Sequence, residues 1–176
     1  TEAMMINVIN YAKKAVLEPD NYEARANLMW TSSLALNNLV TYGKKHGDWA
    51  SHGIEHEVSA IYDITHGAGL AILFPNVLKY YLDKDIAGSL PLIKFLNLGK
   101  NVFGISNDDE KAAALKTIEK IRDFFDTLDM PSKLSDENVY DSKIDVMAKG
   151  SARKGTLGYY HMLEEKDIFE ILKKSV

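Results

Sequence analysis

Apolar residues recur at helical spacing along most of this chain of 176 residues. One face of the first segment carries Met5, Val8, Ile9, Ala12, Ala15 and Val16. Pro19 bars further extension of this helix, because its ring removes an amide hydrogen. The same periodicity predicts helices at residues 21–43, 48–61, 70–82, 92–102, 112–128, 141–153 and 165–174. The second helix is largely apolar, which predicts a central position in the core.

Short polar residues and glycine mark the expected helix ends. Gly43 is the predicted C-cap of the second helix, because glycine readily adopts the left-handed backbone found there. Asp48 and Ser106 are the predicted N-caps of the helices that follow them, since their side-chain oxygens can accept hydrogen bonds from the first amides. Asp109 adds negative charge to the first turn of the later helix.

Residues 63–69 are predicted to connect the third and fourth helices. Gly67 and Gly69 could either let the backbone pass close to a cofactor or permit the turn, and we favour the turn. Pro75 is expected to kink the fourth helix or to lie near its start. The glycines do not complete the dinucleotide-binding pattern G-x-G-x-x-G, because Ile72 occupies the third glycine position and no strand precedes them. No nucleotide-binding residue is therefore identified.

The predicted fold class is all-α, a multi-helix bundle. No segment shows the alternation of apolar and polar residues that is typical of strands. No repeat, low-complexity stretch or linker divides the chain, and 46% of its residues are hydrophobic. A chain of this length can bury a sizeable core, so we expect residues 1–176 to form a single helical domain.

Charge and composition argue against several classes of partner. The net charge is −4 and no run of lysine or arginine is longer than a pair, so nothing attracts nucleic acid or an anionic membrane. The most apolar stretch is too short to cross a bilayer, and no signal peptide is evident. The chain lacks cysteine, so a bound metal would need imidazole or oxygen ligands. We expect a cytoplasmic protein.

Four of the five histidines lie between residues 46 and 66. His52 and His56 are four residues apart on the third predicted helix, so their rings project from one face and can approach a common divalent ion. This spacing alone is weak support for a metal site. His46 is expected to be a surface residue, and His161 receives no role.

Two alternatives belong to other functional classes. His52, Glu55 and His56 satisfy the H-x-x-E-H pattern of inverzincin zinc peptidases, in which the glutamate is the base. Gly53 weakens the helix, and the chain lacks the strands that usually hold an extended peptide. The second alternative is a non-enzymatic helical interaction module with incidental histidines. Outside the peptidase hypothesis, Glu55 and Glu57 are expected to be solvated or to support neighbouring ligands.

The wider segment around the histidines resembles a known enzyme family. Residues 48–75 (DWASHGIEHEVSAIYDITHGAGLAILFP) and 21–30 (NYEARANLMW) are similar to the iron-containing alcohol dehydrogenases, especially their butanol dehydrogenase-like branch. The similarity is strong between residues 19 and 81 and looser towards the C-terminus. It implies that the bundle is the helical domain of this family, which has a dehydroquinate synthase-like fold.

The resemblance implies a two-domain enzyme that transfers hydride between a primary alcohol or aldehyde and NAD(P). An N-terminal α/β domain would bind NAD(P), and the helical domain would bind Fe²⁺ or Zn²⁺ in the cleft. We therefore expect this chain to be the C-terminal part of a longer enzyme, with the nucleotide-binding domain missing and no activity alone. The apolar surface left by that domain would favour a homo-oligomer.

The resemblance also implies roles for individual histidines. The family's metal has one aspartate and three histidine ligands, and two of these histidines align with His52 and His66. The other two ligands form a D-x-x-x-H pair earlier in the family sequence. Asp48 has this spacing from His52, but it aligns with the residue that caps the helix. His56 aligns with a histidine on the nicotinamide side of the cleft, a candidate proton relay in catalysis.

Overall fold

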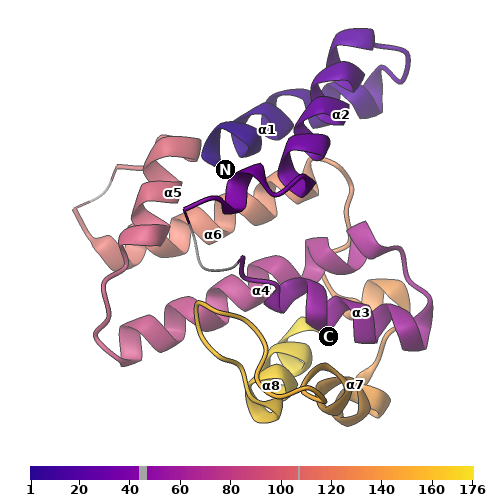
Figure 1. Ribbon diagram of the computed structural model, residues 1–176, viewed down its shortest axis with the longest axis vertical. Coiled ribbons are helices and arrows are strands. Elements are labelled where there is room, and N and C mark those ends of the chain that lie inside the picture. Colours follow the sequence, from indigo (N-terminus) through magenta and orange to yellow (C-terminus); the bar gives the residue numbers. More distant parts are fainter. Residues whose placement is uncertain (44–46, 107) are drawn as a thin grey trace. The chain divides into compact units, whose positions relative to one another are not determined.

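The computed structural model of the chain describes residues 1–43, 47–106 and 108–176, and it is helical throughout its regular structure (Figure 1). The α-helices are α1 (Glu2–Leu17), α2 (Tyr22–Leu36), α3 (Ala50–Tyr62), α4 (His66–Ala87), α5 (Ile93–Phe103), α6 (Glu110–Asp126), α7 (Ile144–Ser151) and α8 (Glu165–Ser175). Short 3₁₀ helices are η1 (Leu39–Thr41), η2 (Leu134–Glu137) and η3 (Asp141–Lys143). Within the described residues, β-type pairing is limited to one isolated antiparallel bridge between Leu157 and Leu163. The predicted all-α class is confirmed.

Backbone packing divides the chain into two compact units. The first comprises Thr1–Gly47 and Leu92–Leu128, with α1 packed on α2 and α5 on α6. The second comprises Asp48–Pro91 and Asp129–Val176, in which α3 packs on α4 and α7, and α8 packs on α4 and α7. The single domain over residues 1–176 stays a prediction.

The last third of the predicted second helix departs from the helical course, and Gly43 is not its C-cap. α2 ends at Leu36, and Asn38 adopts a left-handed backbone with φ of 67°. The side-chain oxygen of Asn37 accepts a hydrogen bond from the Leu39 amide at 3.0 Å. Asparagine tolerates this conformation and its side chain competes with helical hydrogen bonding, so the Asn37–Asn38 pair turns the chain into η1.

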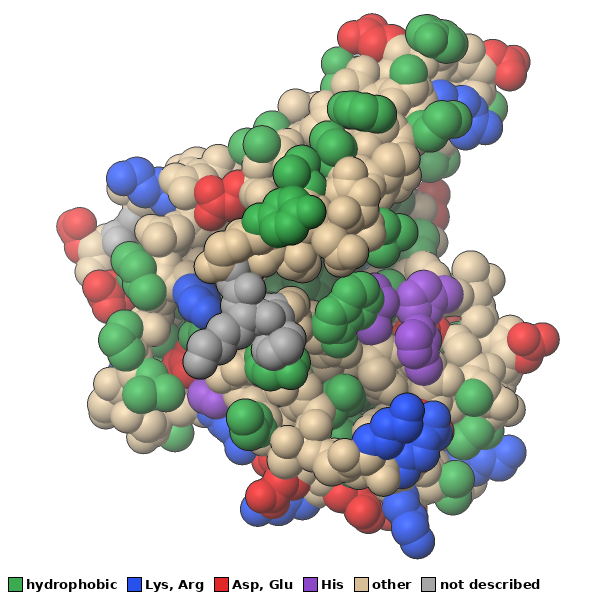
Figure 2. Space-filling model, in the orientation of Figure 1, with side chains coloured by type: hydrophobic (Ala, Val, Ile, Leu, Met, Phe, Trp, Pro, Cys, Tyr) green, Lys and Arg blue, Asp and Glu red, His purple; other side chains and the backbone are tan. Residues whose placement is uncertain are grey.

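The prediction that the second helix is central is wrong. The buried positions of α2 are Ala24 and Thr31, and Thr31 accepts a 2.6 Å hydrogen bond from the side chain of Asn7 in α1. The face of α2 that packs is therefore small and partly polar, while Trp30 is 66% exposed. Hydrophobic side chains of α2 are accordingly exposed on the surface of the molecule (Figure 2).

The fourth helix starts earlier than the glycines suggest. Asp63 ends α3 in the left-handed conformation with φ of 54°, and Thr65 is extended, so the connection is confined to residues 63–65. Gly67 and Gly69 lie inside α4, and the prediction that they permit a turn is wrong. Pro75 also lies within α4, which continues to Ala87.

The predicted N-caps differ in detail from the observed ones. Asp109 caps α6 by accepting hydrogen bonds from two backbone amides of the first turn at 3.0 and 3.1 Å, so the assignment of Ser106 is wrong. Trp49 occupies the N-cap position of α3. Asp48, one residue earlier, still accepts a hydrogen bond from the Ala50 amide at 3.0 Å.

The loop before α8 is anchored to the second unit by two carboxylates. Asp48 accepts hydrogen bonds from the amides of Tyr159 and Tyr160 at 3.0 and 2.8 Å. Buried Asp85 of α4 accepts from the Tyr160 hydroxyl at 2.6 Å and lies 2.7 Å from His161 Nε2. His161, which the sequence left without a role, is therefore a structural partner of Asp85.

Helices α3, α4 and α8 supply much of the core of the second unit. Their fully buried apolar side chains include Ile54, Val58, Ile72, Leu73, Leu82, Ile168, Ile171 and Leu172. The apolar positions of α8 in this set, Ile168, Ile171 and Leu172, are spaced so that they lie on one face of the helix. Among the described residues, no helix has the combination of length and apolar character needed to cross a membrane.

Asp167 joins α8 to α4 through charge-assisted hydrogen bonds. Its Oδ1 accepts from the Tyr80 hydroxyl at 2.6 Å and from Lys84 Nζ at 2.9 Å, and its Oδ2 accepts from the Glu164 amide at 2.8 Å. Burial raises the pKa of Asp167, but the hydrogen bonds from Tyr80, Glu164 and Lys84 outweigh it, and the pKa lies below its usual value. The carboxylate is thus held in its charged form.

We expect Asp167→Ala to lower the free energy of unfolding by about 2–3 kcal/mol at neutral pH, because hydrogen bonds to a charged group are lost. A lowered folded-state pKa stabilises the fold above the ordinary aspartate pKa of about 3.9, and this contribution disappears as the pH falls below it. Urea unfolding at neutral and acidic pH measures the difference. Asp83→Ala is the control, since Asp83 forms an exposed pair with Lys79 worth about 0.5 kcal/mol or less. Equal losses in both variants would contradict the assignment.

Candidate metal centre

One face of α3 carries both a buried acid and two histidines. His52, Glu55, His56 and Ser59 are spaced so that they lie on the same side of a helix. Glu55 is fully buried, His52 is half-buried and His56 is exposed. The boundary between core and solvent therefore runs along this face, and the imidazoles lie on its outer side.

His66, the first residue of α4, brings a third ring to this face. Its ring centroid lies 5.4 Å from that of His52 and 5.3 Å from that of His56, and the His52 and His56 centroids are 6.5 Å apart. Imidazole nitrogen binds zinc at about 2.0–2.1 Å, so rings that share one ion have centroids roughly 5–6 Å apart. The three histidines singled out in the sequence are brought together, and Figure 2 shows histidine side chains gathered on the surface.

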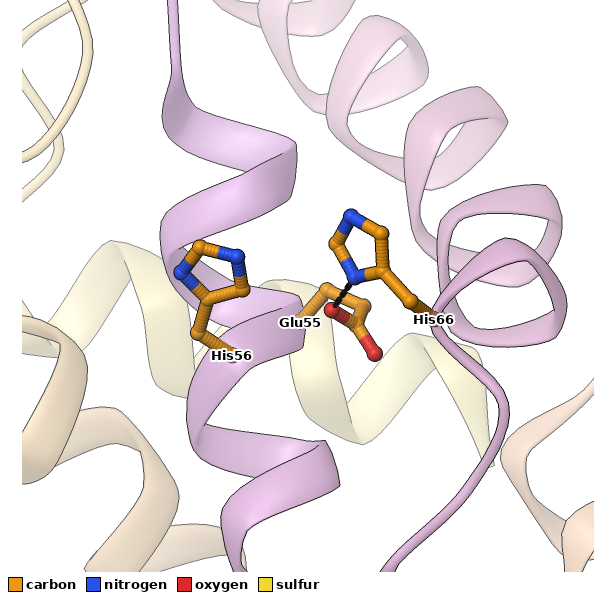
Figure 3. A group of neighbouring side chains, drawn as sticks. All are labelled: Glu55, His56 and His66. Carbon is orange, nitrogen blue, oxygen red and sulfur yellow. Dashed lines mark hydrogen bonds and ion pairs between the residues drawn. The ribbon is translucent and has the colours of Figure 1, made fainter.

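Glu55 is hydrogen-bonded through both carboxylate oxygens. Ser59 Oγ donates to Oε1, and His66 Nδ1 is hydrogen-bonded to Oε2 (Figure 3). The expectation that Glu55 is solvated is wrong, while the expectation that it supports a neighbouring residue agrees with this contact. Glu57 forms an ion pair with Arg153 instead, and its side chain is 16% exposed.

The available donors fit a divalent transition metal. Ligand atoms of Glu55, His56 and His66 lie within 4.8 Å of one another, and the half-buried His52 ring adjoins them. Imidazole nitrogen suits iron and zinc alike. Both Glu55 oxygens and Nδ1 of His66 are engaged in hydrogen bonds, so we regard the imidazole nitrogens other than His66 Nδ1 as the candidate ligands.

The surroundings of His52 favour the form that binds metal. Burial lowers the pKa of the His52 imidazole, and the neighbouring rings of His66 and His56 lower it further, against a smaller opposite effect of Glu55. The edge of Trp49 packs against the ring, with 4.8 Å between centroids. A lowered pKa favours the neutral imidazole, which is the species that coordinates a metal ion.

Gly69 contributes to the site in a way that the sequence analysis missed. A Cβ atom at this position would lie 2.6 Å from Glu55 Cγ and 2.7 Å from its Oε1, closer than such atoms approach in proteins. A Cβ at Gly67 would meet nothing within 4 Å. The absence of a side chain at residue 69 is therefore what leaves room for the Glu55 carboxylate against α4.

A pocket elsewhere in the second unit is a poorer candidate. Its volume is about 720 Å³, and it contains none of the clustered histidines. It is lined by Tyr80, Asp145, Ala148, Glu165, Lys166, Asp167, Phe169 and Glu170. A lining rich in carboxylates differs from the mostly apolar walls of typical small-molecule sites.

The contacts of Glu55 and the distance between the His52 and His66 rings argue against the two alternative functions. The peptidase needs His52 and His56 on one zinc with Glu55 beside its water, but Glu55 is buried and engaged by Ser59 and His66. The interaction module predicts that the His52 and His66 rings point apart, whereas their centroids are 5.4 Å apart. The prediction for His46 lies outside the described residues.

A family model described as Fe-containing alcohol dehydrogenase family, C-terminal, matches residues 1–176. The chain belongs to this family. The resemblance stated from its histidine-containing segment is thereby confirmed, and neither the peptidase nor the interaction module is supported.

Relatives in this family include butanol dehydrogenases. The chain is 45% identical to NADH-dependent butanol dehydrogenase B of Clostridium acetobutylicum, with 99% of the chain and 44% of that protein covered. It is 35% identical to the NADPH-dependent aldehyde reductase YqhD of Escherichia coli, over 84% of the chain and 36% of that protein. The chain thus spans less than half the length of these relatives.

Solved structures agree with the helical fold. The crystal structure of NADH-dependent butanol dehydrogenase A from Thermotoga maritima matches 99% of the chain with a TM-score of 0.88 and 34% identity, and the match covers 44% of that structure. The structure of Escherichia coli YqhD matches 99% of the chain with a TM-score of 0.90 and 29% identity, again over 44% of its length. The fold is that of the C-terminal helical part of such enzymes.

Proposed function

We propose that this chain is the metal-binding helical part of an NAD(P)-dependent alcohol dehydrogenase that interconverts a primary alcohol and its aldehyde. The observation that carries the proposal is the convergence of the His52, His56 and His66 rings on one face of the second unit. The names of the relatives, butanol dehydrogenase and aldehyde reductase, support the same substrate class.

His52 and His66 are proposed as two ligands of the metal, with the remaining ligands outside this chain. Fe²⁺ is the proposed ion, because the family is named for iron; Zn²⁺ accepts the same donors, but no relative's name supports it. Such an ion would act as a Lewis acid towards the oxygen of the alcohol or aldehyde. The 5.4 Å between the centroids of these two rings is compatible with one shared ion.

His56 is proposed as the proton relay of the reaction. It lies one helical turn from His52 and is exposed, so it borders the proposed ion and also reaches solvent. A ring in this position can accept the proton that the alcohol oxygen loses and return it in the reverse reaction, directly or through one water molecule.

We propose that the nicotinamide cofactor binds to the part of the enzyme that corresponds to the matched relative outside the 44% covered by the similarity to this chain. NAD(P) would accept hydride from the alcohol or donate it to the aldehyde. Cytoplasmic location and the lack of nucleic-acid and membrane partners stay predictions from charge and hydropathy.

The ligand assignment predicts how alanine variants bind metal. We expect His52→Ala and His66→Ala to weaken Co²⁺ binding at least about tenfold, because each removes one of two protein ligands. His56→Ala is expected to bind within about twofold of wild type, since a relay need not coordinate. Isothermal titration calorimetry with Co²⁺ as an air-stable substitute for Fe²⁺ makes the measurement. Equal weakening by His56→Ala would make His56 a ligand instead.

We expect the 176-residue chain alone to show no alcohol-dependent reduction of NAD(P)⁺. Two imidazoles leave a divalent ion mostly hydrated, and the larger part of the relatives is not covered by this chain. The assay supplies Fe²⁺, butanol and either NAD⁺ or NADP⁺ and follows the absorbance of the reduced cofactor. Formation of NAD(P)H at a rate proportional to chain concentration would contradict this expectation.

Self-association is expected from an apolar stripe on α2, defined by Tyr22, Met29, Trp30 and Leu36. Tyr22, Met29 and Leu36 recur every seventh residue and so lie on one side of the helix, and all four side chains are at least 66% exposed. We expect sedimentation equilibrium to detect oligomers that Trp30→Gln weakens. Met162→Gln, a change at an exposed methionine of the second unit, is the control. A strictly monomeric chain at high concentration would contradict the prediction.

A further inference from the structure

We propose that Glu55 is a positioning residue that holds the His66 ring so that its Nε2 is the atom offered to the metal. This inference rests on the proposed function, because it concerns one of the two proposed ligands. Nδ1 of His66 faces the Glu55 carboxylate, and the other nitrogen is directed away from it (Figure 3). The hydrogen bond thus determines both the orientation of the ring and which nitrogen carries the hydrogen.

The burial of Glu55 is hard to explain by stability alone. Its side chain is fully enclosed, whereas that of His66 is 47% exposed. Removing a carboxylate from water costs several kcal/mol, and apolar residues of similar volume often stabilise such a position better. A buried acid at this position is explained if it orients an exposed neighbour. The exposed neighbour that Glu55 contacts on the adjacent helix α4 is His66.

The contact changes the chemistry of the ring. An ionised carboxylate can only accept hydrogen bonds, so the hydrogen of a neutral His66 lies on Nδ1. Nε2 then keeps its lone pair for the metal, and the negative charge of Glu55 makes that nitrogen a stronger donor. Supporting carboxylates of this kind typically change metal affinity about 10–100-fold when removed.

The contact between Glu55 and His66 requires glycine at residue 69. A Cβ atom there would lie 2.6 Å from Glu55 Cγ and 3.1 Å from Cδ, and the acid is enclosed on its other sides. Gly69→Ala should therefore displace the carboxylate from His66 without altering either residue. Gly67→Ala is a matched control on the same helix, because a Cβ at Gly67 would meet nothing within 4 Å.

The first measurement is Co²⁺ affinity of the 176-residue chain by calorimetry. We expect Gly67→Ala to bind within about twofold of wild type and Gly69→Ala to bind about 10–100-fold more weakly. Glu55→Ala should lose affinity similarly, and Glu55→Gln should lose less because its amide oxygen can still accept from Nδ1. Glu57→Ala controls for loss of a neighbouring acid on α3. Thermal unfolding of each metal-free variant checks that it folds.

The second measurement does not depend on metal. Nitrogen-15 chemical shifts report the tautomer of neutral His66, and we expect hydrogen on Nδ1 in wild type and Gly67→Ala. Glu55→Ala and Gly69→Ala should populate the tautomer with hydrogen on Nε2. An unchanged tautomer and affinity in both variants would overturn the role of Glu55. If wild type shows the expected tautomer but binds no Co²⁺, the proposed metal site fails while the positioning contact stands.

Discussion

A carboxylate enclosed in the core of the second unit contacts the one ring of the histidine cluster that comes from α4. Glu55 is fully buried, and a buried negative charge is tolerated only when its oxygens have partners. Ser59 of the same helix provides one and His66 of the next helix provides the other. Because the connection between α3 and α4 is confined to residues 63–65, the partner from α4 comes from its first turn. One requirement, a hydrogen-bonded place for the buried carboxylate, therefore links three features of α4. They are where the helix starts, how His66 is oriented and why residue 69 has no side chain.

The same turn of α3 serves both the core and the surface. Helical spacing places His52, Glu55 and His56 in a single stripe, which runs from exposed His56 to fully buried Glu55. The acid on the inner side is buried and has hydrogen-bond partners on both oxygens, while the His56 ring on the outer side is exposed. A rigid inner anchor beside exposed donors is what a site needs if its nitrogens are to keep their positions before an ion arrives.

Local patterns in the sequence predicted the helices and the proximity of His52 and His56, because both follow from helical periodicity alone. They did not predict the direction of Glu55, which depends on where α4 packs. They also misplaced the start of α4, since a glycine kept for close packing has the same appearance in a sequence as a glycine kept for a turn. The exposed position of α2 was missed because periodicity does not show that its packed face consists of small residues such as Ala24.

The H-x-x-E-H pattern shows why a short motif cannot assign chemistry without its packing partner. In a peptidase the glutamate would face the metal-bound water, whereas Glu55 faces inward to His66 and Ser59. Both arrangements are compatible with the same five residues on a helix. What separates them here is the inward direction of Glu55, for which Gly69 on another helix leaves room, because a Cβ at that position would lie 2.6 Å from Glu55 Cγ. A residue that permits the observed direction of Glu55 therefore lies outside the motif itself.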